Sequence, residues 1–244
     1  MICTFDIGNT NVHIGLYQNG CLVYTQRWRT QQGFERKIIG RLLAKREIEG
    51  VAIASVVPNV SKMLTQYLRS RFGIKPFFIN ARIKMPVKIA YGNLGPDRIA
   101  AINGGYLRYH DNIIIFSLGT AITGDVVTEE GIHCGGIILP GPDTQLWSLT
   151  QKTALISKIS LNGRFNLLGK NTTGCVRSGI LNSTKFTIER FIDEIKNNYK
   201  KQYRTIITGG WAPRFAHLIT GIDRVDEDLI LYGIFQLYQK NVSG

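Results

Sequence analysis

Three apolar segments open the chain, and a polar loop and a tight turn separate them. Ile2–Phe5 and Val12–Tyr17 flank the polar loop Asp6–Asn11. The dipeptide Asn19-Gly20 then separates the second segment from Cys21–Trp28. Asn-Gly between two apolar runs is typical of a β-hairpin with a type I′ turn. The pattern therefore predicts strand, polar loop, strand, turn and strand.

Helical and strand-like patterns alternate through the rest of the first half. Apolar residues recur at helical spacing within Phe34–Glu49 and again in the segment that begins at Pro58. Val51–Val57 is apolar and rich in β-branched residues, which predicts a buried strand. Phe77–Ile79 predicts another short strand, and a further helix is expected from Asp97.

The opening order of elements then recurs. Ile113–Phe116 predicts a strand, and the glycine-containing loop Ser117–Ala121 follows it. Two more apolar segments, Ile122–Thr128 and Ile132–Leu139, come next with a turn between them. The second half therefore repeats strand, loop, strand, turn and strand.

The two loops correspond position by position. Gly119 stands where Gly8 stands, and Ser117 stands where Asp6 stands. A duplicated pattern is much more informative about architecture than a single loop.

Helical patterns at Thr144–Thr153 and Asn171–Tyr199 and a strand at Thr205–Thr208 continue the second half. We therefore predict an α/β protein of two duplicated domains, residues 1–110 and 111–244.

Composition narrows the class of protein. The chain has 244 residues and a formal net charge of +13, from 30 lysines and arginines against 17 aspartates and glutamates. No apolar run approaches 18 residues and no basic leader precedes an apolar one, so we expect a cytoplasmic protein without a membrane partner. The basic residues are spread out, with no zinc-finger or RNA-binding aromatic motif, so we do not expect nucleic acid as a partner.

The first loop has the chemistry of a phosphate site. Gly8 lets a ligand approach the backbone closely, and successive backbone N–H groups in such a turn attract anions. Asp6 could hold a divalent cation through water, as magnesium prefers. The alternative is an ordinary β-turn rich in turn-forming residues, and the matching second loop favours the phosphate interpretation.

Seven short motifs run through nearly the whole length of the chain. They are Asp6-Ile7-Gly8-Asn9-Thr10-Asn11, Ser55-Val56-Val57-Pro58, Gly95-Pro96-Asp97-Arg98, Gly119-Thr120-Ala121-Ile122-Thr123, Gly135-Gly136-Ile137-Ile138-Leu139-Pro140-Gly141, Gly169-Lys170-Asn171-Thr172 and Thr208-Gly209-Gly210. In this order they resemble the type III pantothenate kinases of the sugar-kinase/actin superfamily. The resemblance implies two ribonuclease-H-like, actin-like domains, each a mixed five-stranded sheet with flanking helices, and a cleft between them.

The resemblance implies an ATP site built from both halves. Thr120 would contact the phosphates from the second loop, and Gly209 and Gly210 would let adenosine lie against the backbone. The first-half residues implied to hold the phosphates are Asp6, Ile7, Gly8, Asn9, Thr10, Asn11, Val12 and His13.

The resemblance also implies an acceptor site. Asp97 would be the general base that takes the proton of the pantothenate hydroxyl, and Arg98 would supply positive charge. The other residues implied to shape this site are Tyr91, Gly95, Pro96 and Thr172. From the residues alone, Asp97 could be only an acid at a helix N-terminus, and Thr172 could be the N-cap of the helix that follows.

Three positions concern cations. Asp6 would hold Mg²⁺ through water, and Asp125 is a secondary candidate. The family usually has aspartate where this chain has Ser117, and that aspartate binds a monovalent cation such as K⁺ or NH₄⁺. Serine offers one neutral oxygen, so the site is either lost or completed by other oxygens.

The resulting hypothesis is an ATP-dependent kinase that phosphorylates pantothenate to 4′-phosphopantothenate, the first step of coenzyme A synthesis. The resemblance further implies a homodimer. Two alternatives stay open: a non-catalytic or regulatory relative that acts as a nucleic-acid-associated accessory factor, and a kinase of the same fold for another small alcohol.

Overall fold

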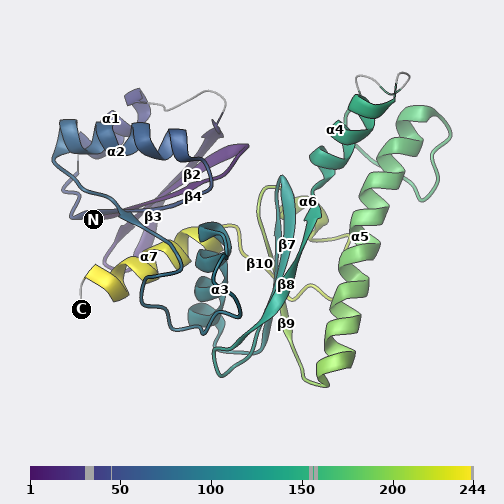
Figure 1. Ribbon diagram of the computed structural model, residues 1–244. Coiled ribbons are helices and arrows are strands. Elements are labelled where there is room, and N and C mark those ends of the chain that lie inside the picture. The colour runs from purple at the N-terminus through teal and green to yellow at the C-terminus, as the bar shows by residue number, and fades with distance from the viewer. Residues whose placement is uncertain (31–35, 45, 154–155, 157–158, 243–244) are drawn as a thin grey trace. The chain divides into compact units, whose positions relative to one another are not determined.

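The computed structural model describes residues 1–30, 36–44, 46–153, 156 and 159–242 (Figure 1). The chain forms two compact units. The first comprises residues 1–110, 127–134 and 228–244, and the second comprises residues 111–126 and 135–227. Among the described residues, no helix is both long enough and apolar enough to cross a membrane.

The first unit is built on a five-stranded sheet in the order β3-β2-β1-β4-β5. Its strands are β1 (Ile2–Ile7), β2 (Asn11–Gln18), β3 (Cys21–Arg29), β4 (Gly50–Ser55) and β5 (Phe77–Phe78). The first three strands are antiparallel, while β4 pairs with β1 in parallel, so the sheet is mixed. Asn19 and Gly20 have φ values of 51° and 82°, which is the geometry of the predicted type I′ turn.

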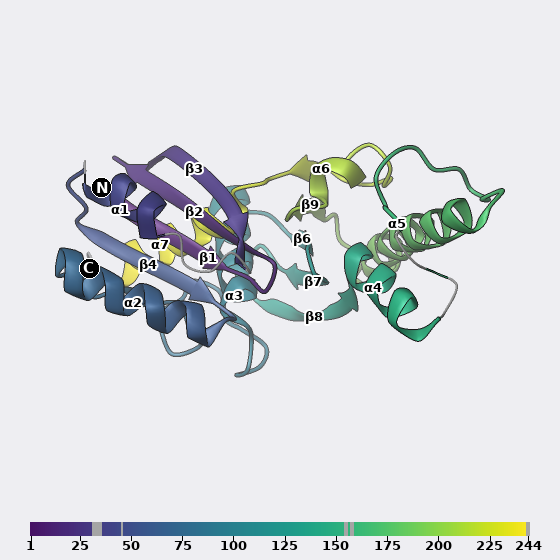
Figure 2. The same ribbon diagram turned by 90° about the horizontal axis from the view of Figure 1, so that it is seen from above.

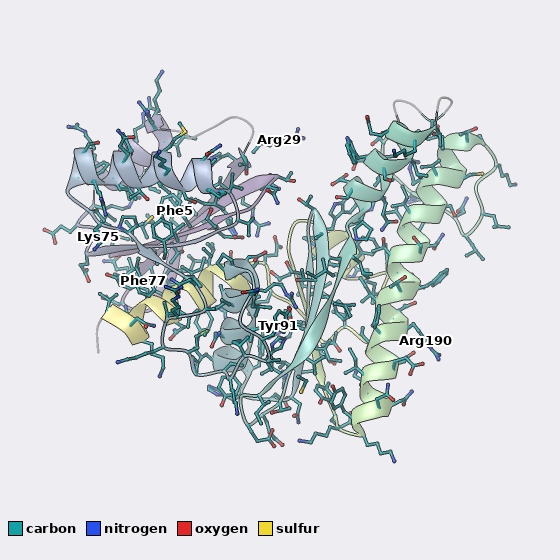
Figure 3. The ribbon with its side chains drawn as sticks, viewed as in Figure 1. Phe5, Arg29, Lys75, Phe77, Tyr91 and Arg190 are labelled. Atoms are coloured by element: carbon teal, nitrogen blue, oxygen red, sulfur yellow. The ribbon has the colours of Figure 1, made fainter. Side chains whose placement is uncertain are left out.

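Helices cover both faces of this sheet (Figures 1 and 2). The helices α1 (Arg36–Ala44) and α2 (Pro58–Phe72) lie on one face, and α3 (Pro96–Tyr109) and α7 (Leu229–Val242) lie on the other. Side chains of β1, α1 and α2 form one apolar core that includes Phe5, Ile39 and Leu64 (Figure 3). The predicted helix Phe34–Glu49 corresponds to α1, and its positions 34, 35 and 45 lie outside the described residues.

The second unit repeats the strand order of the first. Its sheet has the order β10-β9-β6-β7-β8. Read from β8 to β10, this matches the first sheet, with β8, β7, β6, β9 and β10 in the places of β3, β2, β1, β4 and β5. The strands are β6 (Ile113–Leu118), β7 (Ala121–Val127), β8 (His133–Pro140), β9 (Arg204–Thr208) and β10 (Arg224–Val225). The helices are α4 (Pro142–Lys152), α5 (Thr172–Tyr199) and the short α6 (Ala212–Phe215). The predicted duplicated α/β fold with two mixed five-stranded sheets is confirmed.

The C-terminal helix α7 belongs to the first unit. Phe235 of α7 stacks on Tyr17 of β2, with ring centroids 4.2 Å apart. Gly104 of α3 and Gly233 of α7 let the two helix backbones approach closely. Segments 127–134 and 228–244 therefore belong to the same unit as residues 1–110. The predicted domains instead divide the chain once, after residue 110. The domain ranges 1–110 and 111–244 stay a prediction.

The crossing of α3 and α7 gives a stability prediction. A methyl group at Gly233 would overlap the backbone of Ala100, so Gly233→Ala should destabilise the protein by about 2–3 kcal/mol. Urea unfolding measures the change. Gly179→Ala is the control, because a methyl group there on α5 meets nothing within 4 Å, and we expect no loss of stability. Equal effects of the two substitutions would contradict close packing at the crossing.

Candidate functional site: two glycine loops and the acidic start of α3

The first glycine loop joins β1 to β2 and is held from both sides. The amide of Gly8 donates to the carbonyl of Asn11 at 2.9 Å, which closes the turn. The hydroxyl of Thr30 donates to the carbonyl of Gly8 at 2.7 Å. On the other side, the amide of Val56 donates to the carbonyl of Ile7 at 3.0 Å. The backbone of the loop is therefore fixed before any ligand binds.

The loop residues divide into anchors and exposed positions. Ile7, Val12 and His13 are buried, so only their backbone can face a ligand. Asn9, Thr10 and Asn11 are exposed and Gly8 is partly exposed. The middle of the loop is therefore accessible, and its role in binding an anion stays a prediction.

A row of polar side chains crosses the sheet beside this loop. In register, Asp6 pairs with His13, and His13 pairs with Arg27. Burial and the charge of Arg27 lower the pKa of His13 to about 3, so the ring is neutral at pH 7. His13 shares a 2.6 Å hydrogen bond with the hydroxyl of Thr25. Its 3.7 Å approach to Asp228 is consequently a contact and not an ion pair at pH 7.

The carboxyl group of Asp6 interacts with charges of both signs in the first unit's site. Burial raises the pKa of the Asp6 carboxyl to about 7, and the negative charge of Asp97 adds to the increase, while Arg27 opposes it. A carboxyl group with this pKa is only half ionised at neutral pH. A cation beside it would favour the ionised form, because opposite charge stabilises the carboxylate.

The start of α3 holds the acceptor motif. Gly95 is the N-cap, Pro96 opens the helix, and Asp97 lies in its first turn. The carboxylate of Asp97 lies over Gly95, since a methyl group built there would be 2.7 Å from its Oδ1. The helix dipole at this end favours an ionised acid, which can accept a proton.

Arg98 is buried and not on the surface, although its sequence context alone would suit a surface charge. It is 6% exposed, and its guanidinium donates to the hydroxyl of Tyr91 at 2.7 Å. Tyr91 lies beside α3 with 44% of its surface exposed (Figure 3). Arg98, which directly follows Asp97 in the sequence, therefore forms a polar cluster with Tyr91.

The second glycine loop joins β6 to β7. The amide of Gly119 donates to the carbonyl of Ala121 at 3.1 Å. The carbonyl of Thr120 accepts from the amide of Gly141 at 2.9 Å and from the hydroxyl of Thr144 at 2.6 Å. The N-terminus of α4 thus supports this loop.

The two glycines after β9 have different surroundings. Gly209 has φ 92°, and a methyl group there would collide with the backbone of Leu118. Only glycine fits that position. Gly210 has nothing within 4 Å of the place of its missing side chain, so its backbone is accessible to a ligand.

Few charged side chains lie at the positions predicted to bind cations. Asp6 is the predicted Mg²⁺ position, and Mg²⁺ binds through one or two carboxylates plus waters and substrate phosphates. Ser117 pairs in register with Thr208, whose hydroxyl is buried without a hydrogen-bond partner. These are two neutral oxygens. Within the described part of the chain, no cluster of three histidine, cysteine, aspartate or glutamate residues could hold a metal.

Comparison with known proteins identifies the family. The family model described as type III pantothenate kinase matches residues 2–194. Two curated relatives carry that description: one from Geotalea uraniireducens (strain Rf4) is 32% identical, and one from Geotalea daltonii is 31% identical. Each alignment covers 99% of this chain and 99% of the relative. The chain belongs to the type III pantothenate kinase family.

Solved structures support the fold. A Campylobacter jejuni protein described as a Baf family transcriptional activator has a TM-score of 0.60 at 19% identity and covers 98% of both chains. The activator of the 2-hydroxyisocaproyl-CoA dehydratase from Clostridium difficile has a TM-score of 0.55 at 13% identity, over 97% of this chain and 93% of that one. At such identities the likeness concerns the fold. As a member of its family the chain is an ATP-binding kinase of coenzyme A biosynthesis.

One position differs from what the sequence suggested, and another keeps an untested role. The N-cap of α5 is Asn171, whose side chain accepts from the amide of Gly174 at 2.7 Å. The suggestion that Thr172 is the N-cap was therefore wrong, and Thr172 is the exposed first residue of the helix. Asp125 is buried on β7 with 2% of its surface exposed, and its role as a cation ligand stays a prediction.

Sequence reasoning missed Thr30, Arg27 and His133. Arg27 lies on β3 and Thr30 follows directly after that strand, whose end reaches the loop only because β3 pairs with β2. A polar residue at every second position of that strand was the available signal. His133 is 1% exposed and lies in the first unit, where it contacts the ring of Tyr91.

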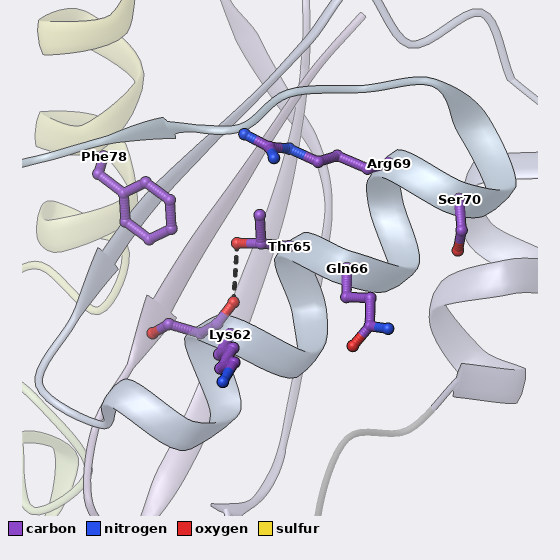
Figure 4. Close-up of a pocket in the computed structure, with 7 residues that line it drawn as sticks. Lys62, Thr65, Gln66, Arg69, Ser70 and Phe78 are labelled. Atoms are coloured by element: carbon purple, nitrogen blue, oxygen red, sulfur yellow. Dashed lines mark hydrogen bonds between the residues drawn. The ribbon is translucent and has the colours of Figure 1, made fainter.

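A hollow on the first unit lies apart from the residues of this site. It has a volume of about 730 Å³ and lies along α2 and β5 (Figure 4). Its lining residues are Ser61, Lys62, Thr65, Gln66, Arg69, Ser70 and Phe78. This lining holds no carboxylate, so it offers neither a general base nor a ligand for Mg²⁺.

The raised pKa of Asp6 gives a prediction for magnesium. Mg²⁺ competes with a proton for this carboxylate, so its affinity should fall about tenfold between pH 8 and pH 6. Calorimetric titration of Mg²⁺ in the presence of a non-hydrolysable ATP analogue measures this.

Two variants control for other groups that titrate. Asp6→Asn should remove most of the pH dependence. Asp97→Asn should move it to lower pH, because the charge of Asp97 helps to raise the pKa of Asp6. An unchanged pH dependence in both variants would contradict the assignment.

Proposed function

We propose that this chain transfers the γ-phosphoryl group of ATP to the primary hydroxyl of pantothenate, with Asp97 as the general base. The observation that carries this is electrostatic. The acid of the acceptor motif lies close enough to the acid of the nucleotide loop to raise its pKa. The group that would take the proton and the loop that would hold the phosphates therefore belong to one site in the first unit.

The proposed reaction needs a positioned nucleophile more than covalent help from the protein. The carboxylate of Asp97 accepts the proton of the hydroxyl as its oxygen forms a bond to the γ-phosphorus. The bond between that phosphorus and the β,γ-bridging oxygen breaks, and ADP leaves. The fixed amides of the Gly8 loop orient the phosphates. Bound Mg²⁺, which Asp6 would hold through water, supplies positive charge to them.

The remaining family roles are part of the same proposal. Tyr91, Gly95, Pro96, Arg98 and Thr172 would form the pantothenate site. The contact between Arg98 and the Tyr91 hydroxyl supports placing these two residues in one site. Thr120, Gly209 and Gly210 would contact ATP, and the open space at Gly210 supports the approach of adenosine.

A homodimer is also proposed. The described surface of the second unit exposes large apolar side chains on α4, on the segment before α5 and on α5 itself. They are Trp147, Leu149, Leu167, Leu168 and Phe186. Contiguous exposed apolar patches typically mark protein–protein contacts, and we propose that these side chains contribute to one.

A cytoplasmic location is also part of the proposal. A nucleic-acid accessory role is not proposed, because family membership makes the chain a kinase and the Campylobacter jejuni likeness concerns the fold alone.

The role of Asp97 has a direct test. Asp97→Asn should lower kcat for pantothenate by about 10²–10⁴-fold, because the amide cannot accept the proton. Coupled turnover with Mg-ATP measures kcat, and thermal unfolding measures stability. Asp193→Asn, an exposed acid on α5, should leave kcat unchanged. A loss of stability in Asp97→Asn with kcat preserved would show that Asp97 serves only the start of α3.

The serine at position 117 gives a separate prediction. Because Ser117 and Thr208 offer only neutral oxygens, replacing Na⁺ by K⁺ or NH₄⁺ should change turnover less than about twofold. Ser117→Asp should introduce activation by K⁺. Strong activation of the wild type that is abolished in Ser117→Ala would contradict the prediction and show that serine supports a site.

A further inference from the structure

The turn between β7 and β8 forms part of the first unit. Its backbone pairs with the segment that precedes Tyr91, at a bridge between Lys88 and Ile132. The amide of Lys88 donates to the carbonyl of Gly131 at 2.8 Å, and the amide of His133 donates to the carbonyl of Lys88 at 3.0 Å. Residues 127–134 are therefore tied by hydrogen bonds to the strand-like segment that leads to Tyr91.

His133 extends this pairing through its side chain. The imidazole is 1% exposed, and its Nδ1 accepts a hydrogen bond from the amide of Ala90 at 3.4 Å. Because Nδ1 accepts, it carries no proton in this arrangement. The ring also lies 6.1 Å from the ring of Tyr91, centroid to centroid, with the planes tilted by 44°.

Tyr91 is held at its other end by Arg98. The guanidinium of Arg98 donates to the Tyr91 hydroxyl at 2.7 Å and lies 5.9 Å from the ring centroid. Residues 90–93 themselves are exposed and lie in bends and turns. The position of Tyr91 therefore depends on two contacts. His133 holds the backbone of the preceding residue, Ala90, and Arg98 holds the Tyr91 hydroxyl.

We propose that His133 is a positioning residue for the acceptor substrate. Its imidazole fixes the backbone at Ala90, and this sets the place of the Tyr91 ring in the pantothenate site. The inference rests on the proposed function, in which Tyr91 lines that site. His133 itself is buried and acts through Tyr91, without touching the reacting atoms.

Two amide substitutions separate the hydrogen bond from simple packing. In His133→Asn the side-chain oxygen can lie close to the place of Nδ1 and accept from Ala90. In His133→Gln the oxygen lies one bond farther out, nearer to the place of Nε2. Both variants bury one amide, so a purely structural cost should be similar in the two.

Steady-state kinetics give the expected result. His133→Gln should raise KM for pantothenate about five- to tenfold, the size expected for one lost hydrogen bond. His133→Asn should stay within about twofold of the wild type. KM for ATP should change less than about twofold in both variants. Equal KM values for pantothenate in the Asn and Gln variants would overturn the proposal, as would an equal change in KM for ATP.

A second pair of variants changes Ala90, the exposed donor of the same hydrogen bond, in case the variants of buried His133 do not fold. Ala90→Pro removes the donating amide, whereas Ala90→Ser keeps it. Only the proline variant should raise KM for pantothenate, and equal values for the two would count against the bond.

A double-mutant comparison tests the route of the effect. If His133 acts through Tyr91, His133→Gln should have no further effect on KM in a Tyr91→Ala background. Full additivity of the two substitutions would overturn the positioning role.

The wild type separates this inference from the function on which it rests. If the wild type does not phosphorylate pantothenate, both fall. If it does and the paired variants behave alike, the proposed function stands and the role of His133 falls.

Discussion

The placement of two acids, Asp6 and nearby Asp97, constrains the candidate site of the first unit. Asp97 raises the pKa of Asp6, which burial has already raised, so the pair resists carrying two full negative charges near pH 7. Arg27 offsets part of this from β3. A nucleotide-bound cation would remove the conflict, because it gives both carboxylates a positive neighbour. In the proposed function, this pair of acids would therefore favour binding of a metal–nucleotide complex.

The scaffold keeps these two acids at fixed places. Asp6 is the last residue but one of the central strand β1, and the loop after this strand is tied to Thr30 on one side and to Val56 on the other. Asp97 belongs to a helix that is clamped against α7 where Gly104 and Gly233 meet. Rigid elements therefore set the relation between the acids, which suits a reaction that depends on positioning.

The sequence predicted most of the local structure. Asn19-Gly20 has the positive φ values of the expected turn, and the two glycine loops follow corresponding strands of two equally ordered sheets. These features depend on residues close together in the chain, where spacing and turn chemistry carry the information.

Contacts between distant segments could not be predicted in this way. The return of α7 to the first unit, the burial of Arg98 and the pairing of the β7–β8 turn with Lys88 each join residues far apart in sequence. The N-cap of α5 shows a local limit. Asn171 and Thr172 are both suitable capping residues, and only the backbone geometry decides between them.

The central claim is that Asp6 and Asp97 serve one phosphoryl-transfer site. A crystal structure with Mg²⁺, a non-hydrolysable ATP analogue and pantothenate tests it most directly. The account predicts a magnesium-bound water on the Asp6 carboxylate and the pantothenate primary hydroxyl within hydrogen-bonding distance of the Asp97 carboxylate. Pantothenate bound with that hydroxyl away from Asp97, or magnesium held without Asp6, would contradict it.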